Sequence, residues 1–273
     1  MGGTVRPVGA AAVFSDGEAG KGTFVPALQK QLTKYLTDAH SIERQALAQM
    51  RAAPSLAGDP RIAEAFAAHC RETERHERLV CDRVEERDAR PSMLKDVLGI
   101  LTGKGFVAFA RAQPDTTGKL VAHAFSYEHM ERAAYDMIEW VAERADDERT
   151  AATAREIAAE EDAMAERLRG CFDAAVAISL RETKGSDLAG KLADYLADAH
   201  AIEAQSLRLL GRARKLAGHA ALADAYARHR EETERVATRI LAEEADAARQ
   251  VHSRFGAALE ASLPHRGGVR AAA

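Results

Sequence analysis

Apolar residues recur at every third or fourth position through most of the chain, which places them on one face of an α-helix. Helix breakers and caps divide this pattern: Pro54 and Gly58 end the first segment, and Asp59-Pro60 is typical of an N-cap followed by a first-turn proline. The pattern predicts six long helices, at residues 24–53, 60–89, 119–145, 148–177, 187–216 and 220–255.

The connections between the first four predicted helices are short, long and short. The long one, residues 91–118, contains a short amphipathic piece at 93–112. This order fits a ferritin-like four-helix bundle with one long crossover. We therefore predict an all-α fold, with this bundle over residues 24–178 and an additional C-terminal helical hairpin over residues 186–256. The tails, 1–23 and 257–273, are expected to be disordered or loose.

The C-terminal hairpin repeats the first two helices. YLTDAHSIERQAL at 35–47 matches YLADAHAIEAQSL at 195–207, and AFAAHCRETER at 65–75 matches AYARHREETER at 225–235. The second copy contains two helices and not four, so its apolar face has no partner within the copy. It must pack on the first bundle or on the same hairpin of another chain, and we predict a homodimer through this hairpin.

Each helix of the predicted bundle has one carboxylate in the middle of its apolar stripe: Glu43, Glu72, Glu131 and Glu161. Burying an isolated carboxylate costs several kcal/mol unless it is paired, protonated or bound to a metal. Two divalent cations at the centre would cancel the repulsion among four such groups. His76 lies one turn after Glu72 and can join them. This ligand set predicts a di-iron or di-manganese site, with Glu128 as a further candidate ligand.

Other interpretations of these residues stay open. The glutamates could pair with arginines in a polar core layer. His69 is interpreted as a core histidine or an outer partner of the site, and the helix at 148–177 has no histidine near Glu161. Core packing is preferred to a redox role for Tyr127, Tyr135 and Trp140.

Four sequence blocks carry a family resemblance: DAHSIERQ, HCRETERH, YEHMERAAY and EEDAMAERL. In order and spacing they resemble the YciE/YciF-type family of ferritin-like bacterial stress proteins over residues 28–176, with a partial second match over 187–241. The resemblance implies a ferritin-like bundle, homo-oligomerisation and a di-metal site. The matching acidic positions are Glu43, Glu72, Glu131 and Glu161, with Glu128 and His76 close by.

Composition narrows the class of protein further. Of 273 residues, 38 are basic and 42 acidic, and this formal net charge of −4 argues against nonspecific nucleic-acid binding. Three cysteines form neither a disulfide framework nor a CxxC zinc site, which favours a cytoplasmic location. No convincing export signal precedes the first helix, and no apolar run approaches the roughly 20 residues of a membrane span.

Two functions of different classes follow. The first is a di-metal carboxylate protein of a bacterial stress response that handles iron, oxygen or peroxide, as an oxidase or peroxide-reactive enzyme. The second is a non-catalytic stress or scaffold protein with a vestigial metal site. A membrane-surface role for residues 93–112 is a third alternative.

Overall fold

The computed structural model describes residues 21–89, 116–181 and 188–262. All regular structure in these ranges is helical, which confirms the all-α class. The chain divides into two compact units, Met1–Ser179 and Leu180–Ala273, which we call the bundle unit and the hairpin unit. The amphipathic piece predicted at 93–112 lies outside the described residues.

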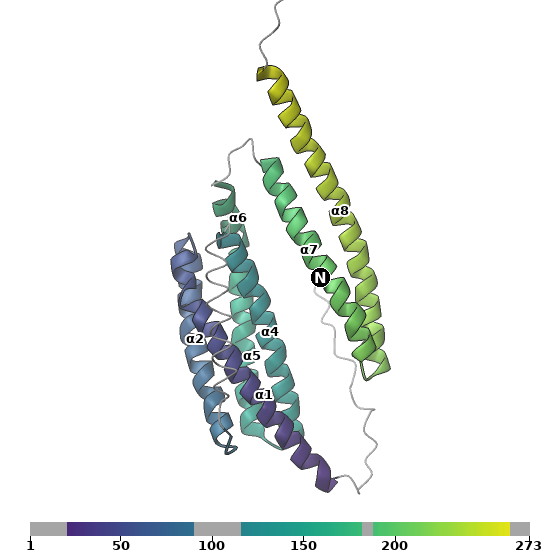
Figure 1. The fold of residues 1–273 in the computed structure, drawn as a ribbon. Coiled ribbons are helices and arrows are strands. Elements are labelled where there is room, and N and C mark those ends of the chain that lie inside the picture. Colours follow the sequence, from purple (N-terminus) through teal and green to yellow (C-terminus); the bar gives the residue numbers. More distant parts are fainter. Residues whose placement is uncertain (1–20, 90–115, 182–187, 263–273) are drawn as a thin grey trace, which may run out of the picture. The chain divides into compact units, whose positions relative to one another are not determined.

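Four long helices form the bundle unit: α1 (Lys21–Met50), α2 (Pro60–Glu85), α4 (Thr116–Arg144) and α5 (Glu148–Arg169) (Figure 1). The helices α1 and α5 each contact both α2 and α4, so the four enclose one core as a ring. A short 3-10 helix, η2 (Ala53–Leu56), stands between α1 and α2, and α6 (Phe172–Arg181) follows α5.

Local side chains set several helix ends. Asp59 caps α2 by accepting a hydrogen bond from the Arg61 backbone N–H at 2.8 Å, directly before Pro60. Asp147 caps α5 by accepting from the Thr150 backbone N–H at 3.0 Å. The single helix predicted over 148–177 is interrupted at Gly170, a residue type with low helix propensity, and α6 begins two residues later.

Two apolar clusters make up the core, one toward each end of the bundle. One cluster joins the first half of α1 to the last half of α2, through Leu36 and Val84. The last half of α4 and the first half of α5 contribute Ala142 and Ala151 to the same cluster. Because the last halves of α2 and α4 share a cluster, these helices run in the same direction. The end of α2 and the start of α4 therefore lie at opposite ends of the bundle, as a crossover connection requires.

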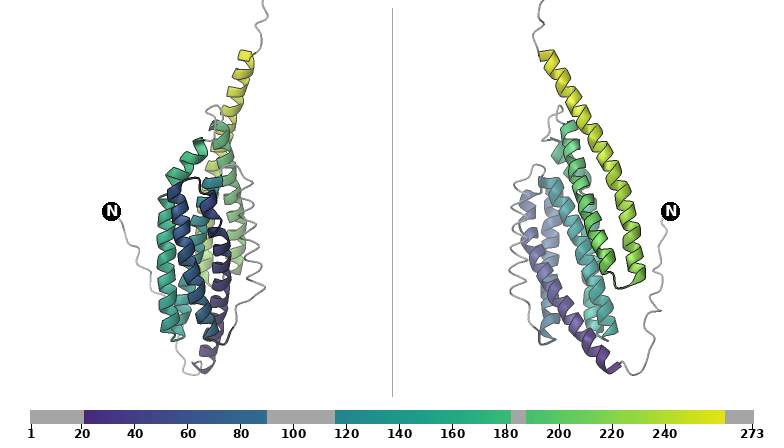
Figure 2. Two further views of the ribbon diagram at one scale, coloured as in Figure 1. Left: turned by 90° about the vertical axis from the view of Figure 1, so that its left-hand side faces the viewer. Right: turned by 45° about the vertical axis from the view of Figure 1, so that its right-hand side comes forward.

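The hairpin unit consists of α7 (Leu188–Leu216) and α8 (Ala220–Ser262), which pack side by side (Figure 2). Few of its described side chains are buried, and Thr233 and Ala237 are the clearest examples. Large apolar side chains on both helices stay exposed: Leu188, Leu192, Ile202, Leu209, Leu216, Leu222 and Leu241. Among the described helices, none has the length and apolar character to span a membrane.

Candidate metal centre

A layer of ionisable side chains separates the two apolar clusters of the bundle. Each of the four long helices contributes to this layer, and all six side chains are buried: Glu43 of α1, His69 and His76 of α2, Glu128 and Glu131 of α4, and Glu161 of α5. Helical spacing explains the inward direction. Glu43, for example, lies four residues after Ala39 and three before Ala46, both of which are buried in the core.

The six side chains form two groups that share one member. His69, Glu128, Glu131 and Glu161 make the first group, and Glu43, His76 and Glu161 make the second. Within each group the candidate ligand atoms lie within 4.8 Å of one another. Ligands of one divalent cation at about 2.0–2.4 Å satisfy this spacing. Each group of buried residues could therefore hold a metal ion.

Glu161 links the groups through its two oxygen atoms. Its Oε2 lies 3.5 Å from His69 Nε2, and its Oε1 lies 3.0 Å from His76 Nδ1. His69 Nε2 is also 3.0 Å from Glu128 Oε2, and His76 Nδ1 is 3.9 Å from Glu43 Oε2. The two imidazoles therefore approach the same carboxylate from different sides.

Several atoms that face the centre have no hydrogen-bond partner, despite these close approaches. The orphaned atoms are Glu43 Oε2, His69 Nε2, His76 Nδ1, both Glu128 carboxylate oxygens, Glu131 Oε1 and both Glu161 carboxylate oxygens. Leaving a buried polar atom unpaired costs about 1–3 kcal/mol, and more when it is charged. Imidazole nitrogens and carboxylate oxygens are ligands that iron and manganese accept, so the donor set fits such ions.

Three buried carboxyl groups of the layer have raised pKa values, because they lie close together and away from water. Burial, reinforced by the charge of Glu161, raises the pKa of Glu43 to about 8. Burial also raises the pKa of Glu161 to about 7, and that of Glu131 well above its ordinary value. Burial acts to lower the pKa of His69, but the neighbouring carboxylates outweigh it and raise that pKa to about 10. Positive charge in this layer is therefore stabilised.

Glu72, a predicted ligand, does not join either group. It accepts hydrogen bonds from Arg167 Nη1 at 3.2 Å and Arg167 Nη2 at 2.5 Å, and its Oε2 lies 2.9 Å from His69 Nδ1. The bonds to His69 and then Arg167 lower the pKa of Glu72 to about 2. The structure places Glu72 outside both groups. The two α2 side chains that face the centre are His69 and His76, which lie seven residues, or two turns, apart.

Two residues at the centre, His69 and Glu160, are not among the ligands that the sequence predicts. His69 belongs to the first group, and its signal in the sequence was its place in the stripe two turns before His76. Glu160 was missed: its Oε2 lies 2.8 Å from His76 Nε2. Glu160 lies outside the apolar stripe that points to the adjacent Glu161, so the periodicity gives no signal for it.

The aromatic residues divide between core and surface. The Tyr135 hydroxyl donates a hydrogen bond to Glu43 Oε1 in the buried layer, and burial raises the pKa of that hydroxyl well above its ordinary value. The Tyr127 hydroxyl donates to the Ile42 carbonyl at 3.4 Å. Trp140 does not pack in the core as predicted, since it is 58% exposed.

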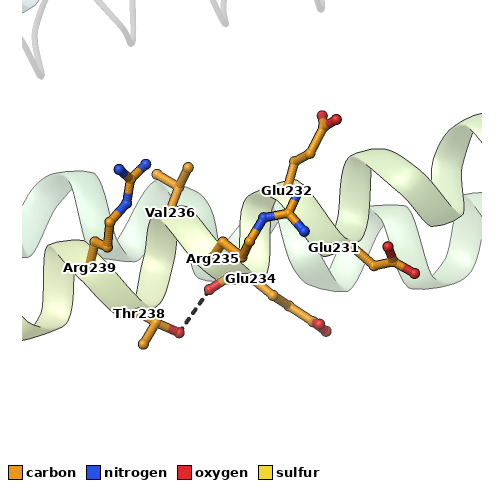
Figure 3. Close-up of a pocket in the computed structure, with 7 residues that line it drawn as sticks. All are labelled: Glu231, Glu232, Glu234, Arg235, Val236, Thr238 and Arg239. Carbon is orange, nitrogen blue, oxygen red and sulfur yellow. Dashed lines mark hydrogen bonds between the residues drawn. The ribbon is translucent and has the colours of Figure 1, made fainter.

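A wide surface pocket elsewhere in the protein contains none of these donors. It belongs to the hairpin unit and is lined by α8 residues only, among them Glu232, Arg235 and Arg239 (Figure 3). The labelled side chains extend on different sides of that helix (Figure 3). The pocket therefore offers no convergent set of ligands.

Comparison with known families identifies the bundle unit. Residues 27–180, more than half of the chain, match the family described as Domain of unknown function (DUF892). The chain belongs to the DUF892 family. All six inward-facing side chains fall inside the part of the chain that matches DUF892.

A solved structure and a search of curated proteins complete the comparison. A crystal structure of a protein from Xanthomonas campestris pv. campestris is 24% identical, with a TM-score of 0.48, and the match covers 57% of this chain and 97% of that one. No curated protein matches this DUF892 chain.

Proposed function

We propose that the bundle unit of this DUF892 protein is a di-metal carboxylate protein whose centre takes iron or manganese. One observation carries the proposal. Six buried side chains on four helices converge, and each has at least one oxygen or nitrogen atom without a hydrogen-bond partner. Bound cations would supply the missing partners and offset the repulsion among the carboxylates.

Each residue has a role in this proposal. Glu161 would contribute a carboxylate oxygen to each position, because its two oxygens lie near different histidines. His69, Glu128 and Glu131 complete the first position, and Glu43 and His76 complete the second. Four glutamates and two histidines are also the ligand inventory of di-iron carboxylate bundles, although here both histidines come from one helix.

The surrounding residues hold the ligands and exclude water. Apolar clusters lie on both sides of the layer, and the Tyr135 hydroxyl holds one oxygen of Glu43. A bound pair of redox metals supplies reactivity toward oxygen or peroxide, which suits ferrous iron oxidation or peroxide removal. The resemblance to ferritin-like YciE/YciF-type stress proteins supports this choice.

A second candidate function is a non-catalytic helical stress or scaffold protein. The observation that favours it is the close pairing of histidine with glutamate, at 3.0 Å for both His69–Glu128 and His76–Glu161. Burial disfavours a charged His76, but Glu161 and Glu43 outweigh it and raise its pKa. Protonated histidines can therefore offset part of the acidic charge without a metal.

Metal analysis separates these candidates. The untagged protein is loaded anaerobically with Fe²⁺ or Mn²⁺, desalted, and assayed for bound metal beside Glu43→Ala/Glu161→Ala. We expect about two ions per chain in the wild type and fewer than one in the variant. Absence of bound metal in the loaded wild type would contradict the centre. Oxygen or peroxide consumption by the loaded wild type, lost in the variant, then tests turnover.

We also infer that the hairpin unit forms a homodimer. Its exposed leucines and Ile202 give both helices apolar surface that a second hairpin could cover. Sedimentation of the full chain tests this inference, with Leu192→Glu/Ile202→Glu as the disrupting variant. A wild-type monomer at all concentrations would refute it.

A further inference from the structure

A carboxylate and an arginine hold His69 from the side that faces away from the centre. Glu72 Oε2 lies 2.9 Å from His69 Nδ1. Arg167 of α5 in turn donates to both Glu72 oxygens, at 3.2 and 2.5 Å. We call this arrangement the first relay.

His76 has a matching arrangement, the second relay. Glu160 Oε2 lies 2.8 Å from His76 Nε2. Arg75 donates to Glu160 Oε1 and also lies 3.0 Å from Glu156 Oε1. The two helices exchange roles between the relays. In the first relay α2 supplies the glutamate and α5 the arginine, and in the second relay α5 supplies the glutamate and α2 the arginine.

The chemistry of each relay fixes where its imidazole carries a proton. An ionised carboxylate has only acceptor sites, and an arginine has only donors. The outer nitrogen of each histidine must therefore donate its N–H to the glutamate. In a neutral ring this leaves the lone pair on the inner nitrogen, which is Nε2 in His69 and Nδ1 in His76.

We propose, on the basis of the di-metal centre above, that Glu72–Arg167 and Glu160–Arg75 are positioning residues that make the two histidines ligate through opposite nitrogens. His69 presents Nε2 to the first position, and His76 presents Nδ1 to the second. Two histidines of one helix, two turns apart, can thereby serve two different ions. The relays replace the arrangement in which each of two helices supplies one histidine.

The relays extend from buried rings to the surface. The imidazoles are at most 1% exposed, the glutamates 29% each, and the arginines 37% and 40%. Substitution of the glutamates therefore changes a partly hydrated position and not the packed core. Outer partners of metal-binding histidines commonly change metal affinity about 10–100-fold when they are replaced.

Long-range ¹H–¹⁵N spectra of the full chain loaded with Zn²⁺ test the assignment directly. His69→Gln and His76→Gln variants identify the two rings. We expect a protonated Nδ1 and a zinc-shifted Nε2 in His69, and the reverse in His76. Ligation of both rings through the same type of nitrogen would overturn the proposal.

Affinity measurements test the role of the outer residues. Glu72→Gln and Glu160→Gln should each weaken one of two Zn²⁺ ions about 10–100-fold in competition with a chelator. Glu64→Gln on α2 and Glu166→Gln on α5 are matched controls, because these glutamates are exposed and, among the described residues, pair with the exposed Arg71 and Arg169. We expect both controls to stay within about twofold of the wild type. Unchanged affinities in the relay variants refute the positioning role.

The two proposals fail in distinguishable ways. If Zn²⁺ leaves both rings unshifted, the centre itself is refuted, and the relays with it. If Zn²⁺ shifts both rings but through other nitrogens, or without dependence on Glu72 and Glu160, only the relays are refuted. Even if a variant fails to fold, the wild-type spectrum shows whether the two zinc-shifted rings ligate through opposite nitrogens.

Discussion

The hairpins α1–α2 and α7–α8 carry one motif in two environments. Glu43 and His69 correspond to Glu203 and His229, 160 residues later. In α1–α2 both side chains are buried, whereas Glu203 is half-buried and His229 is exposed. The histidine–glutamate pair within one helix is nevertheless present in both copies. His69 Nδ1 lies 2.9 Å from Glu72 Oε2, and His229 Nδ1 lies 3.5 Å from Glu232 Oε2.

This difference separates what a helix does alone from what a bundle adds. A histidine and a glutamate three residues apart meet on any helix. The buried cluster of unpartnered ligand atoms forms where α4 and α5 add Glu128, Glu131 and Glu161. The second copy also has Val236 where the first has His76.

The largest expected effect is on metal binding. Glu43→Ala should remove at least one bound ion, because Glu43 is the α1 member of the second group. Glu203→Ala, the same change in the repeat, should leave the metal content unchanged. Metal analysis after anaerobic loading measures both. Equal loss from the two variants would break the comparison.

The pH dependence of stability should also distinguish the copies. The folded pKa of Glu43, about 8, lies above its ordinary value of 4.5, so the folded metal-free protein binds more protons than the unfolded chain. The free energy of unfolding of the metal-free protein should therefore be greatest near pH 5 and should fall as the pH rises toward 9, by on the order of a few kcal/mol. The raised pKa of His69 acts in the same direction.

Thermal melts of the metal-free protein between pH 5 and pH 9 measure this slope. Glu43→Gln should flatten it, because a neutral amide does not titrate. Glu203→Gln should leave it unchanged. A melting temperature that rises across this range in the wild type would show that the layer is not a crowded acid cluster.

Packing gives a smaller contrast between identical residues. Leu36 is 2% exposed in a core cluster, and its counterpart Leu196 is only half-buried. Leu36→Ala should cost about 2–5 kcal/mol and Leu196→Ala clearly less. Chemical denaturation of each variant measures these losses. Similar losses would show that Leu196 is packed as tightly as Leu36, and would contradict this contrast.

The smallest contrast concerns two glycines. Gly58 has φ +66°, and a Cβ added there would lie 2.9 Å from Thr117 Oγ1. Gly218, its counterpart, has no atom within 4 Å of such a Cβ. Gly58→Ala should cost about 1–2 kcal/mol, and Gly218→Ala about 0.5 kcal/mol or less. Equal stability of the two variants would show that the strained turn is not specific to the first copy.

Much of the fold was predictable because helical periodicity is a local signal. The predicted N-cap Asp59 marks a helix start that the structure confirms, at α2. Five of the predicted site residues, all except Glu72, lie in the two buried groups. Of the four stripe acids, Glu43, Glu131 and Glu161 turn inward, whereas Glu72 pairs with Arg167.

The sequence by itself determined that the chain is helical, that its first hairpin is repeated, and that acids lie among apolar positions. Only the tertiary structure decided which members of the α2 stripe reach the centre: His69 does, and Glu72 does not. Successive residues are separated by about 100° around a helix, so periodicity leaves the rotation of each helix uncertain by roughly one side chain. Packing against the three neighbouring helices sets that rotation, and with it the ligands.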